Sequence, residues 1–208
     1  LLRDVPGSLS LLNVVSLANE KSGNFNAAVD NYAQILKVIP NSTEAYSNMG
    51  NALKAQGKLE EAIAAYAKAL AIKPDTAAVY NNMGNALYRQ GKLEKAIEAY
   101  TQAIAIKPDN AEALHNIVNA LAGVGFKKPN PTIQKIITSL LDRKSFVRPS
   151  EVARAAISLL KFEPELKRHI KDYRVAEVEP TLLEAITDLS RLPLLLKLMS
   201  VCPIDDLN

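Results

Sequence analysis

The feature that most constrains the fold is a strict internal repeat. Pro40, Pro74 and Pro108 are evenly spaced, and residues 43–76 align without gaps to residues 77–110, with 22 of 34 positions identical. A fixed period in this range is typical of stacked repeat architectures. The sequence therefore predicts a solenoid in which each repeat packs mainly on its two neighbours.

Each repeat has the pattern of two helices. In the second repeat, apolar residues recur at helical spacing over residues 45–53 and again over residues 59–72. Gly57 lies between them, where a tight turn favours glycine, and Pro74 ends the second helix because proline cannot continue the hydrogen-bond ladder. We therefore predict an all-α fold with seven helices in the repeat region, namely three complete pairs and one lone first helix.

Two glycines stand in the middle of predicted helices. Gly50 and Gly84 occupy equivalent positions, and glycine inside a helix costs about 1 kcal/mol relative to alanine. A close approach of the second helix of the pair would offset this cost. We expect that approach at Ala62 and Ala96.

The repeated residues resemble the pattern of the tetratricopeptide-repeat (TPR) family. The second repeat supplies Tyr46, Met49, Gly50, Leu53, Gly57, Ala62, Tyr66, Ala69 and Pro74, and the third supplies the equivalent set one period later, with Tyr80, Met83, Gly84, Leu87, Gly91, Ala96, Tyr100, Ala103 and Pro108. The resemblance covers about the first 60% of the chain. It implies a right-handed superhelical TPR solenoid.

The outer repeats depart from this pattern. The first has Ser16 where the helical glycine belongs, and the fourth keeps only its first helix, to about Gly123. Terminal repeats are commonly atypical because they cap the stack. We assign residues 1–125 to the solenoid and residues 126–208 to a C-terminal helical extension that caps it or links it to a further domain.

Within the extension, helix signals are local rather than periodic. Asn130 and Pro131 form a plausible helix start, followed by an apolar stripe from Ile133 to Leu141 that needs a partner surface. Further helices are expected after Ser150 as a cap, from Pro164, from Pro180 and over Leu194–Met199.

The family resemblance implies a concave face lined by six positions of each first helix. Asparagine occupies the sixth and ninth positions in three successive repeats, whereas the other four groove positions differ between the second and third repeats. The sixth-position residues are Asn48, Asn82 and Asn116, and the ninth-position residues are Asn51, Asn85 and Asn119. An amide carries donors and an acceptor, so it can pair with an extended peptide backbone. The alternative is that these asparagines bond within their own repeats.

We predict that the remaining groove residues provide selectivity; they are Ser47, Lys54, Asn81, Tyr88, Arg89 and His115. The asparagine pattern is similar to that of the O-linked N-acetylglucosamine transferases. The carboxylate clamp of chaperone-binding repeats is missing, because the matching positions hold Asn13, Leu17, Ala78 and Asn82.

Other function classes are not favoured by the sequence. Neither His115 nor His169 lies in metal-ligand spacing with Cys or another His, and there is no phosphate-binding glycine loop, so we expect no catalysis, metal or cofactor. The net charge of +3 does not favour nucleic acid as a partner, and the apolar run from Leu192 to Val201 is too short to span a membrane. The single Cys202 favours a reducing compartment, so we expect a cytoplasmic protein.

Three functions are compatible with these observations. The first is a protein-interaction module that binds an extended peptide or partner protein in the concave groove. The second is a substrate-presenting or regulatory part of a larger glycosyl- or methyltransferase. The third is a self-associating scaffold.

Overall fold

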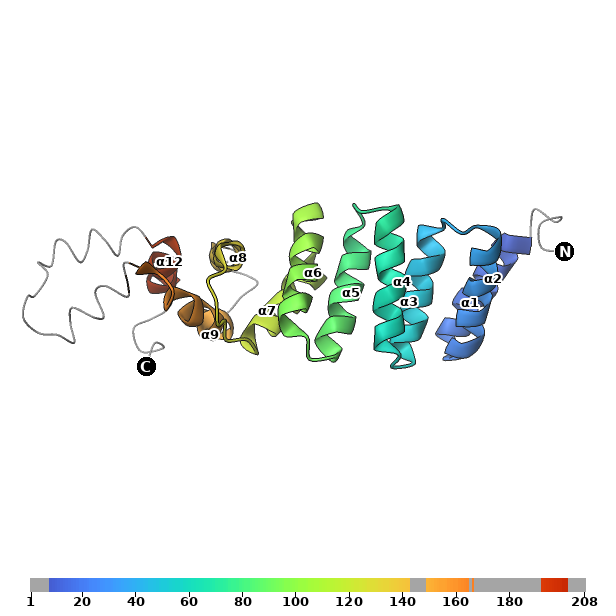
Figure 1. The fold of residues 1–208 in the computed structure, drawn as a ribbon, viewed down its shortest axis with the longest axis horizontal. Coiled ribbons are helices and arrows are strands. Elements are labelled where there is room, and N and C mark those ends of the chain that lie inside the picture. Colours follow the sequence, from blue (N-terminus) through green and yellow to red (C-terminus); the bar gives the residue numbers. More distant parts are fainter. Residues whose placement is uncertain (1–7, 143–148, 165, 167–191, 202–208) are drawn as a thin grey trace, which may run out of the picture. The chain divides into compact units, whose positions relative to one another are not determined.

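The computed structural model describes residues 8–142, 149–164, 166 and 192–201 (Figure 1). Over these residues the fold is all-α, as predicted, and contains no strand. The helices are α1 (Ser8–Lys21), α2 (Phe25–Val38), α3 (Thr43–Ala55), α4 (Leu59–Ile72), α5 (Ala77–Arg89), α6 (Leu93–Ile106), α7 (Ala111–Ala122), α8 (Pro131–Asp142), α9 (Pro149–Leu160) and α12 (Pro193–Val201). The chain forms two compact units, Leu1–Ala113 and Leu114–Asn208, which are described separately.

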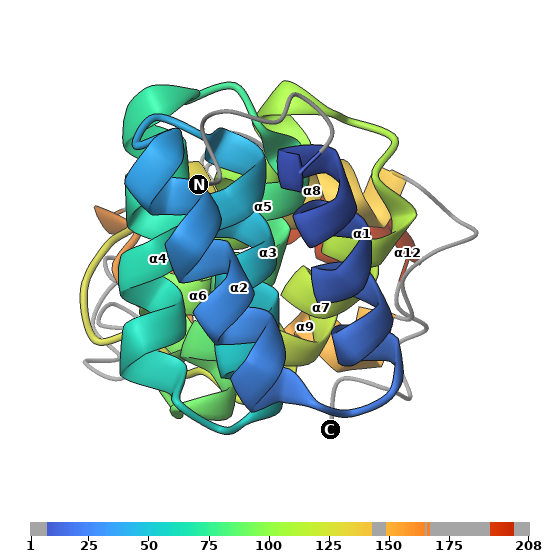
Figure 2. The same cartoon turned by 90° about the vertical axis from the view of Figure 1, so that its right-hand side faces the viewer.

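The first unit is a row of three helix pairs. The helices α1 and α2, α3 and α4, and α5 and α6 pack within pairs, while α2 packs on α3 and α4 packs on α5 between pairs. Figure 2 looks along this row and shows α2, α4 and α6 on one side, with α1, α3 and α5 on the other. With α7 starting the fourth repeat, the seven helices expected of the repeat region are confirmed.

The turns inside the pairs depend on glycine, as expected for Gly57. Gly57 and Gly91 have φ of 79° and 74°, in the left-handed region that side chains with a Cβ rarely adopt. These glycines let the chain reverse in a short turn, which brings both helices of a pair into contact along their length.

A tyrosine fills the interior of each pair. Tyr66 and Tyr100 are 0% and 2% exposed. A Cβ placed on Gly50 would lie 2.5 Å from Cε1 of Tyr66, and one placed on Gly84 would lie 2.5 Å from Cε1 of Tyr100. The expected close approach is therefore present, but its partner is the aromatic ring. The nearest atoms are those of the ring, on the same partner helix as the expected Ala62 or Ala96.

The second unit contains its own apolar core. On α8, the predicted stripe is buried at Ile133, Ile137, Leu140 and Leu141, and α8 packs on both α9 and α12. Lys197 of α12 forms an ion pair with Asp142 of α8. The stripe thus finds partner helices within the second unit.

The predicted helix starts in this unit are partly confirmed. Asn130 Oδ1 accepts a hydrogen bond from the Ile133 amide at 3.1 Å, as a helix cap does. The helix α9 begins at Pro149, so Ser150 lies inside it rather than before it. The last helix, α12, includes the stretch predicted over Leu194–Met199, whereas Pro180 lies outside the described residues.

Candidate functional site

The sixth-position asparagines of the first unit lie on α3 and α5. Asn48 and Asn82 are both half-buried. The Oδ1 of Asn82 accepts a hydrogen bond from the ammonium of Lys54 at 3.4 Å, which joins the twelfth position of one repeat to the sixth of the next. The groove residues of neighbouring repeats are therefore in direct contact.

The ninth-position asparagines bond within their own repeats. Tyr66 Oη donates to Asn51 Oδ1, and Tyr100 Oη donates to Asn85 Oδ1, each at 2.7 Å. Burial raises the pKa of both tyrosines, so their hydroxyls remain protonated donors. The carbonyl oxygens of these two asparagines therefore bond within their own repeats, which is the alternative to peptide binding considered above.

The predicted basic residues lie together between α3 and α5. The guanidinium of Arg89 donates from Nη1 to the carbonyl oxygen of Lys54 at 2.9 Å. Desolvation lowers the pKa of Lys54, with Glu112 opposing this shift and Arg89 adding to it. Tyr88, which precedes Arg89, is 41% exposed. This part of the first unit presents two cations and an aromatic ring.

Two predicted groove residues, Ser47 on α3 and Asn81 on α5, are less exposed than expected. Asn81 is only 3% exposed, so its side chain is part of the interior of the first unit, contrary to its expected place in an open groove. Its position is equivalent to that of Ser47, which is half-buried.

The fourth-repeat residues belong to the second unit. His115 and Asn119 are exposed and Asn116 is half-buried. The predicted site residues that the structure brings together are therefore those of α3 and α5.

Sequence reasoning missed a polar cluster at the first repeat. Asn13 Nδ2 donates to Glu44 Oε1 at 3.3 Å, which joins α1 to α3. The hydroxyl of Tyr32 and Oε1 of Glu20 are buried and have no hydrogen-bond partner among the described residues. The sequence already indicated this difference. Leu17 occupies the ninth position of the first repeat, where the second repeat has Asn51, so Tyr32 lacks the acceptor that Tyr66 has.

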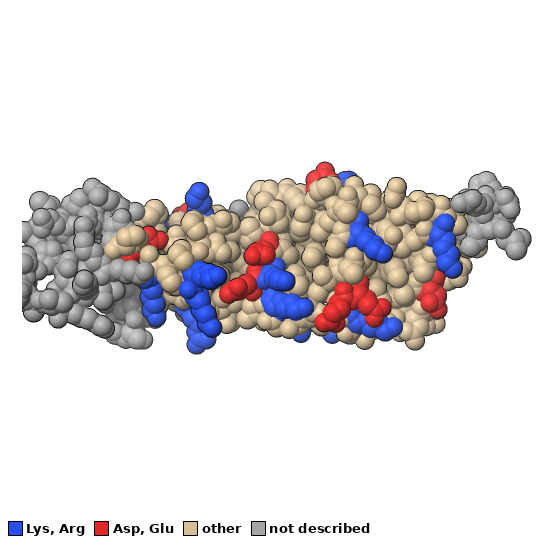
Figure 3. Space-filling model, viewed as in Figure 1, with Lys and Arg blue, Asp and Glu red and all other residues tan. Residues whose placement is uncertain are grey.

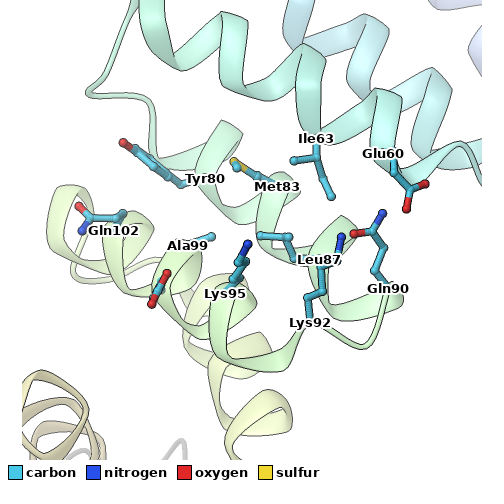
Figure 4. A pocket seen from close by; sticks show the side chains of 11 residues that line it. Glu60, Ile63, Tyr80, Met83, Leu87, Gln90, Lys92, Lys95, Ala99 and Gln102 are labelled. Carbon is cyan, nitrogen blue, oxygen red and sulfur yellow. The ribbon is translucent and has the colours of Figure 1, made fainter. Parts of the chain in front are cut away.

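A second concave surface lies between α4, α5 and α6 (Figure 4). This pocket of about 570 Å³ has an apolar floor and charged residues around it; it is lined by Glu60, Ile63, Tyr80, Met83, Leu87, Gln90, Lys92, Lys95, Glu98, Ala99 and Gln102. A pocket of about 410 Å³ occupies the equivalent place one repeat earlier, with Tyr46, Met49 and Leu53 in its lining. The second-helix side of the unit therefore also offers a repeated concavity.

Charge, metal and membrane features add little to the site. Figure 3 shows basic and acidic side chains mixed over the visible face of the described residues. Among the residues that could be searched, no group of three or more His, Cys, Asp or Glu side chains is placed to hold a metal ion. Within the same part of the chain, no helix is both long and apolar enough to cross a membrane.

Comparison with solved structures gives the same fold in several proteins. The first TPR of Spaghetti (RPAP3), bound to an HSP90 peptide, is 22% identical with a TM-score of 0.52, over 54% of this chain and 89% of that chain. MamA is 23% identical with a TM-score of 0.56, over 83% of this chain and 85% of that one. The O-GlcNAc transferase of Thermobaculum terrenum is 22% identical with a TM-score of 0.53, over 65% of this chain but only 26% of the transferase.

At the sequence level, no match was found among the curated proteins. Residues 50–91 and 84–125 match the family described as TPR repeat, which agrees with the helix pairs and with the period of the sequence. Residues 50–125 thus match tetratricopeptide repeats, and the described part of the chain has the all-α fold of paired helices seen in the TPR structures above.

Proposed function

We propose that the chain is a protein-interaction module that binds an extended peptide along α1, α3 and α5 of the first unit. The observation that carries this proposal is the recurrence of half-buried Asn48 and Asn82 one repeat apart, among groove positions that otherwise vary. Exposed polar residues on a rigid scaffold are commonly used for binding. The peptide-bound RPAP3 structure is a precedent for this use of the fold.

The asparagines at the sixth and ninth positions have different roles in this proposal. The sixth-position amides, Asn48 and Asn82, pair with the peptide backbone, and Asn82 does so while its Oδ1 also accepts from Lys54. The ninth-position amides, Asn51 and Asn85, have their carbonyl oxygens engaged by tyrosine hydroxyls, so they join the two helices of a pair and contribute less to a bound peptide. Such backbone contacts do not depend on peptide sequence, and the neighbouring charged residues supply selectivity.

Selection from a displayed library of random dodecapeptides tests this function. Peptides that bind the whole chain are synthesised, and their affinities are measured by fluorescence anisotropy. Replacing Asn48 and Asn82 together by Ala removes two amide contacts of about 0.5–1.5 kcal/mol each, so we expect affinity to fall by about 5- to 150-fold.

The control is the pair Gln34→Ala and Gln102→Ala. These two exposed amides are separated by two repeat periods and lie on the second helices α2 and α6. The control pair should leave affinity unchanged. If the control weakens binding as much as the asparagine pair, or if the asparagine pair has no effect, the peptide does not bind through the asparagines.

A further inference from the structure

The part of the groove between the second and third repeats holds two cations that hydrogen bonds keep together. The Arg89 guanidinium donates from Nη1 to the carbonyl oxygen of Lys54 at 2.9 Å, and the Lys54 ammonium donates to Asn82 Oδ1 at 3.4 Å. The first bond runs from α5 to the last turn of α3, and the second runs from α3 back to α5. The three side chains are therefore held in one place between the same two helices.

The groups that this cluster leaves unpaired are hydrogen-bond donors. Lysine and arginine side chains carry several N–H donors and no acceptor. Because an ammonium group only donates, Asn82 turns its oxygen towards Lys54 and keeps its own N–H donors for another partner. Among the described residues, these side chains have no hydrogen bonds besides the two that join them. The cluster therefore fits a group that accepts hydrogen bonds and does not donate them.

These donors are accessible from the groove. Arg89 is exposed, Lys54 and Asn82 are half-buried, and the neighbouring Tyr88 is 41% exposed. All four lie on α3 and α5, which Figure 2 shows on the same side of the row as α1. A peptide that runs along α1, α3 and α5 can thus contact the donors without entering the core of the unit.

The two cations have no carboxylate of their own in the described part of the chain. Arg89 is the only charged residue of α5, and the one carboxylate of α3, Glu44, lies in the first turn, whereas Lys54 lies in the last. The rise of the helix separates Glu44 from Lys54 by about 15 Å, beyond the reach of exposed charges at physiological salt. Burial lowers the pKa of Lys54, and the charge of Glu112 opposes this shift without forming an ion pair with either cation. The cluster therefore keeps a net positive charge.

We propose that Lys54, Arg89 and the amide of Asn82 form a subsite for an Asp or Glu side chain of the bound peptide. This inference rests on the proposed function, and it names the chemistry of one peptide residue. An ionised carboxylate only accepts hydrogen bonds, and its oxygens can accept from both cations and the amide together. The bond of Arg89 to the Lys54 carbonyl oxygen orients the guanidinium before the peptide arrives, which reduces the entropy cost of binding.

This subsite differs from the carboxylate clamp of chaperone-binding repeats. Two positions that match the clamp hold Ala78 and Asn82 here, and neither is a cation. The cations come instead from the twelfth position of the second repeat and the thirteenth of the third, and one period earlier the equivalent pair is Glu20 and Ala55. Because the cationic pair does not recur there, an acidic residue fixes the register of a peptide along asparagines that do not read its sequence.

Dodecapeptide selection on three proteins tests the subsite. These are the unaltered chain, the double variant Lys54→Gln with Arg89→Gln, and the control Lys37→Gln with Lys95→Gln, which removes two exposed cations on α2 and α6. We expect Asp and Glu to be enriched about fivefold at one peptide position for the unaltered chain and the control, and not for the double variant. Equal acidic enrichment for the unaltered chain and the double variant would overturn the proposal.

Synthetic peptides measure the contribution of the carboxylate directly. The selected peptides are made with C-terminal amides, so that all their carboxylates belong to side chains. Changing the enriched Asp to Asn, or Glu to Gln, should weaken binding to the unaltered chain and to the control about tenfold. The same change should weaken binding to the double variant by less than about twofold.

The outcomes separate this inference from the proposed function. If the selected peptides depend on Asn48 but show no acidic enrichment, the subsite is wrong and groove binding stands. If the unaltered chain selects no peptide, the proposed function fails and the subsite with it. Should the double variant lose its helical melting transition, the single variant Lys54→Gln decides, because it keeps the backbone oxygen to which Arg89 bonds. Acidic enrichment should there fall by about half or more, and unchanged enrichment overturns the inference.

Discussion

Replacing Gly84 by Ala tests the packing inside the repeats most severely. The added Cβ would lie 2.5 Å from Cε1, 2.7 Å from Cδ1 and 3.0 Å from Cζ of Tyr100. Carbon atoms in contact are separated by about 3.5–4.0 Å, so the ring would have to move by about 1 Å. Tyr100 is 2% exposed, and its hydroxyl is bonded to Asn85 at 2.7 Å, which leaves the ring little room.

Two effects oppose each other in this variant. Alanine gains about 1 kcal/mol over glycine inside a helix. Overpacking a well-filled core costs about 1–3 kcal/mol, and occasionally more. Because three ring atoms are overlapped and the ring is held at both ends, we place the steric cost at or near the upper limit of this range. After the helical gain is subtracted, the variant should lose about 1–2 kcal/mol of unfolding free energy.

Urea denaturation followed by circular dichroism measures this loss. The same substitution in a Tyr100→Leu background removes the ring, so Gly84→Ala should there be neutral or stabilising by up to about 1 kcal/mol. If Gly84→Ala stabilises the unaltered chain, or destabilises both backgrounds equally, the ring does not account for the glycine.

Three further predictions concern Tyr100, Glu20 and Arg89. Tyr100→Phe leaves Asn85 without its donor and should cost about 0.5–1.5 kcal/mol of unfolding free energy in urea, and a loss below about 0.3 kcal/mol would contradict the hydrogen bond's role. Folding raises the pKa of Glu20 above its ordinary value of 4.5, so the folded state favours the protonated carboxyl group. The stabilising effect of this group is therefore present at low pH and is lost as the pH rises through the folded pKa. Glu20→Gln should therefore raise the melting temperature at about pH 7 and have little effect near about pH 4; the reverse pattern would refute the desolvation argument. Arg89→Gln should change which peptides are selected. Its effect on affinity should shrink in about 0.5–1 M salt, where exposed charges are screened. An effect that does not depend on salt would instead assign Arg89 a structural role through its hydrogen bond to the Lys54 carbonyl oxygen.

The helix pairs followed from the sequence because their signals are local. Gly57, Pro74 and the apolar spacing each act on a few neighbouring residues, and the period repeats them. The partner of Gly50 did not follow, since the reach of the Tyr66 ring depends on how far apart the two helices lie. Small residues at Ala62 and Ala96 indicated close packing without identifying the contacting atom.

The role of the ninth-position asparagines could be predicted only in part, for a similar reason. Their carbonyl oxygens bond to the buried tyrosine of the second helix in both the second and third repeats. The first repeat holds Leu17 and Tyr32 at the same separation, and comparison of the three repeats would have shown that one tyrosine lacks an acceptor. A hydrogen bond between two helices is visible in the sequence only through such exceptions.

The apolar stripe of α8 was visible as a pattern, but its partner was not. Hydrophobic periodicity shows which face of a helix is buried and says nothing of what covers it. In the structure, α9 and α12 pack on α8 within the second unit.

An NMR titration with a selected peptide tests the central claim, that the groove of α1, α3 and α5 is the binding surface. The side-chain amide signals of Asn48 and Asn82 and the backbone signals of α3 and α5 should shift in proportion to peptide bound. Signals from the pocket side, such as the methyl groups of Ile63 and Met83, should remain in place. Shifts confined to Ile63, Met83 and their neighbours would show instead that the peptide binds the pocket between α4, α5 and α6, and would contradict the account.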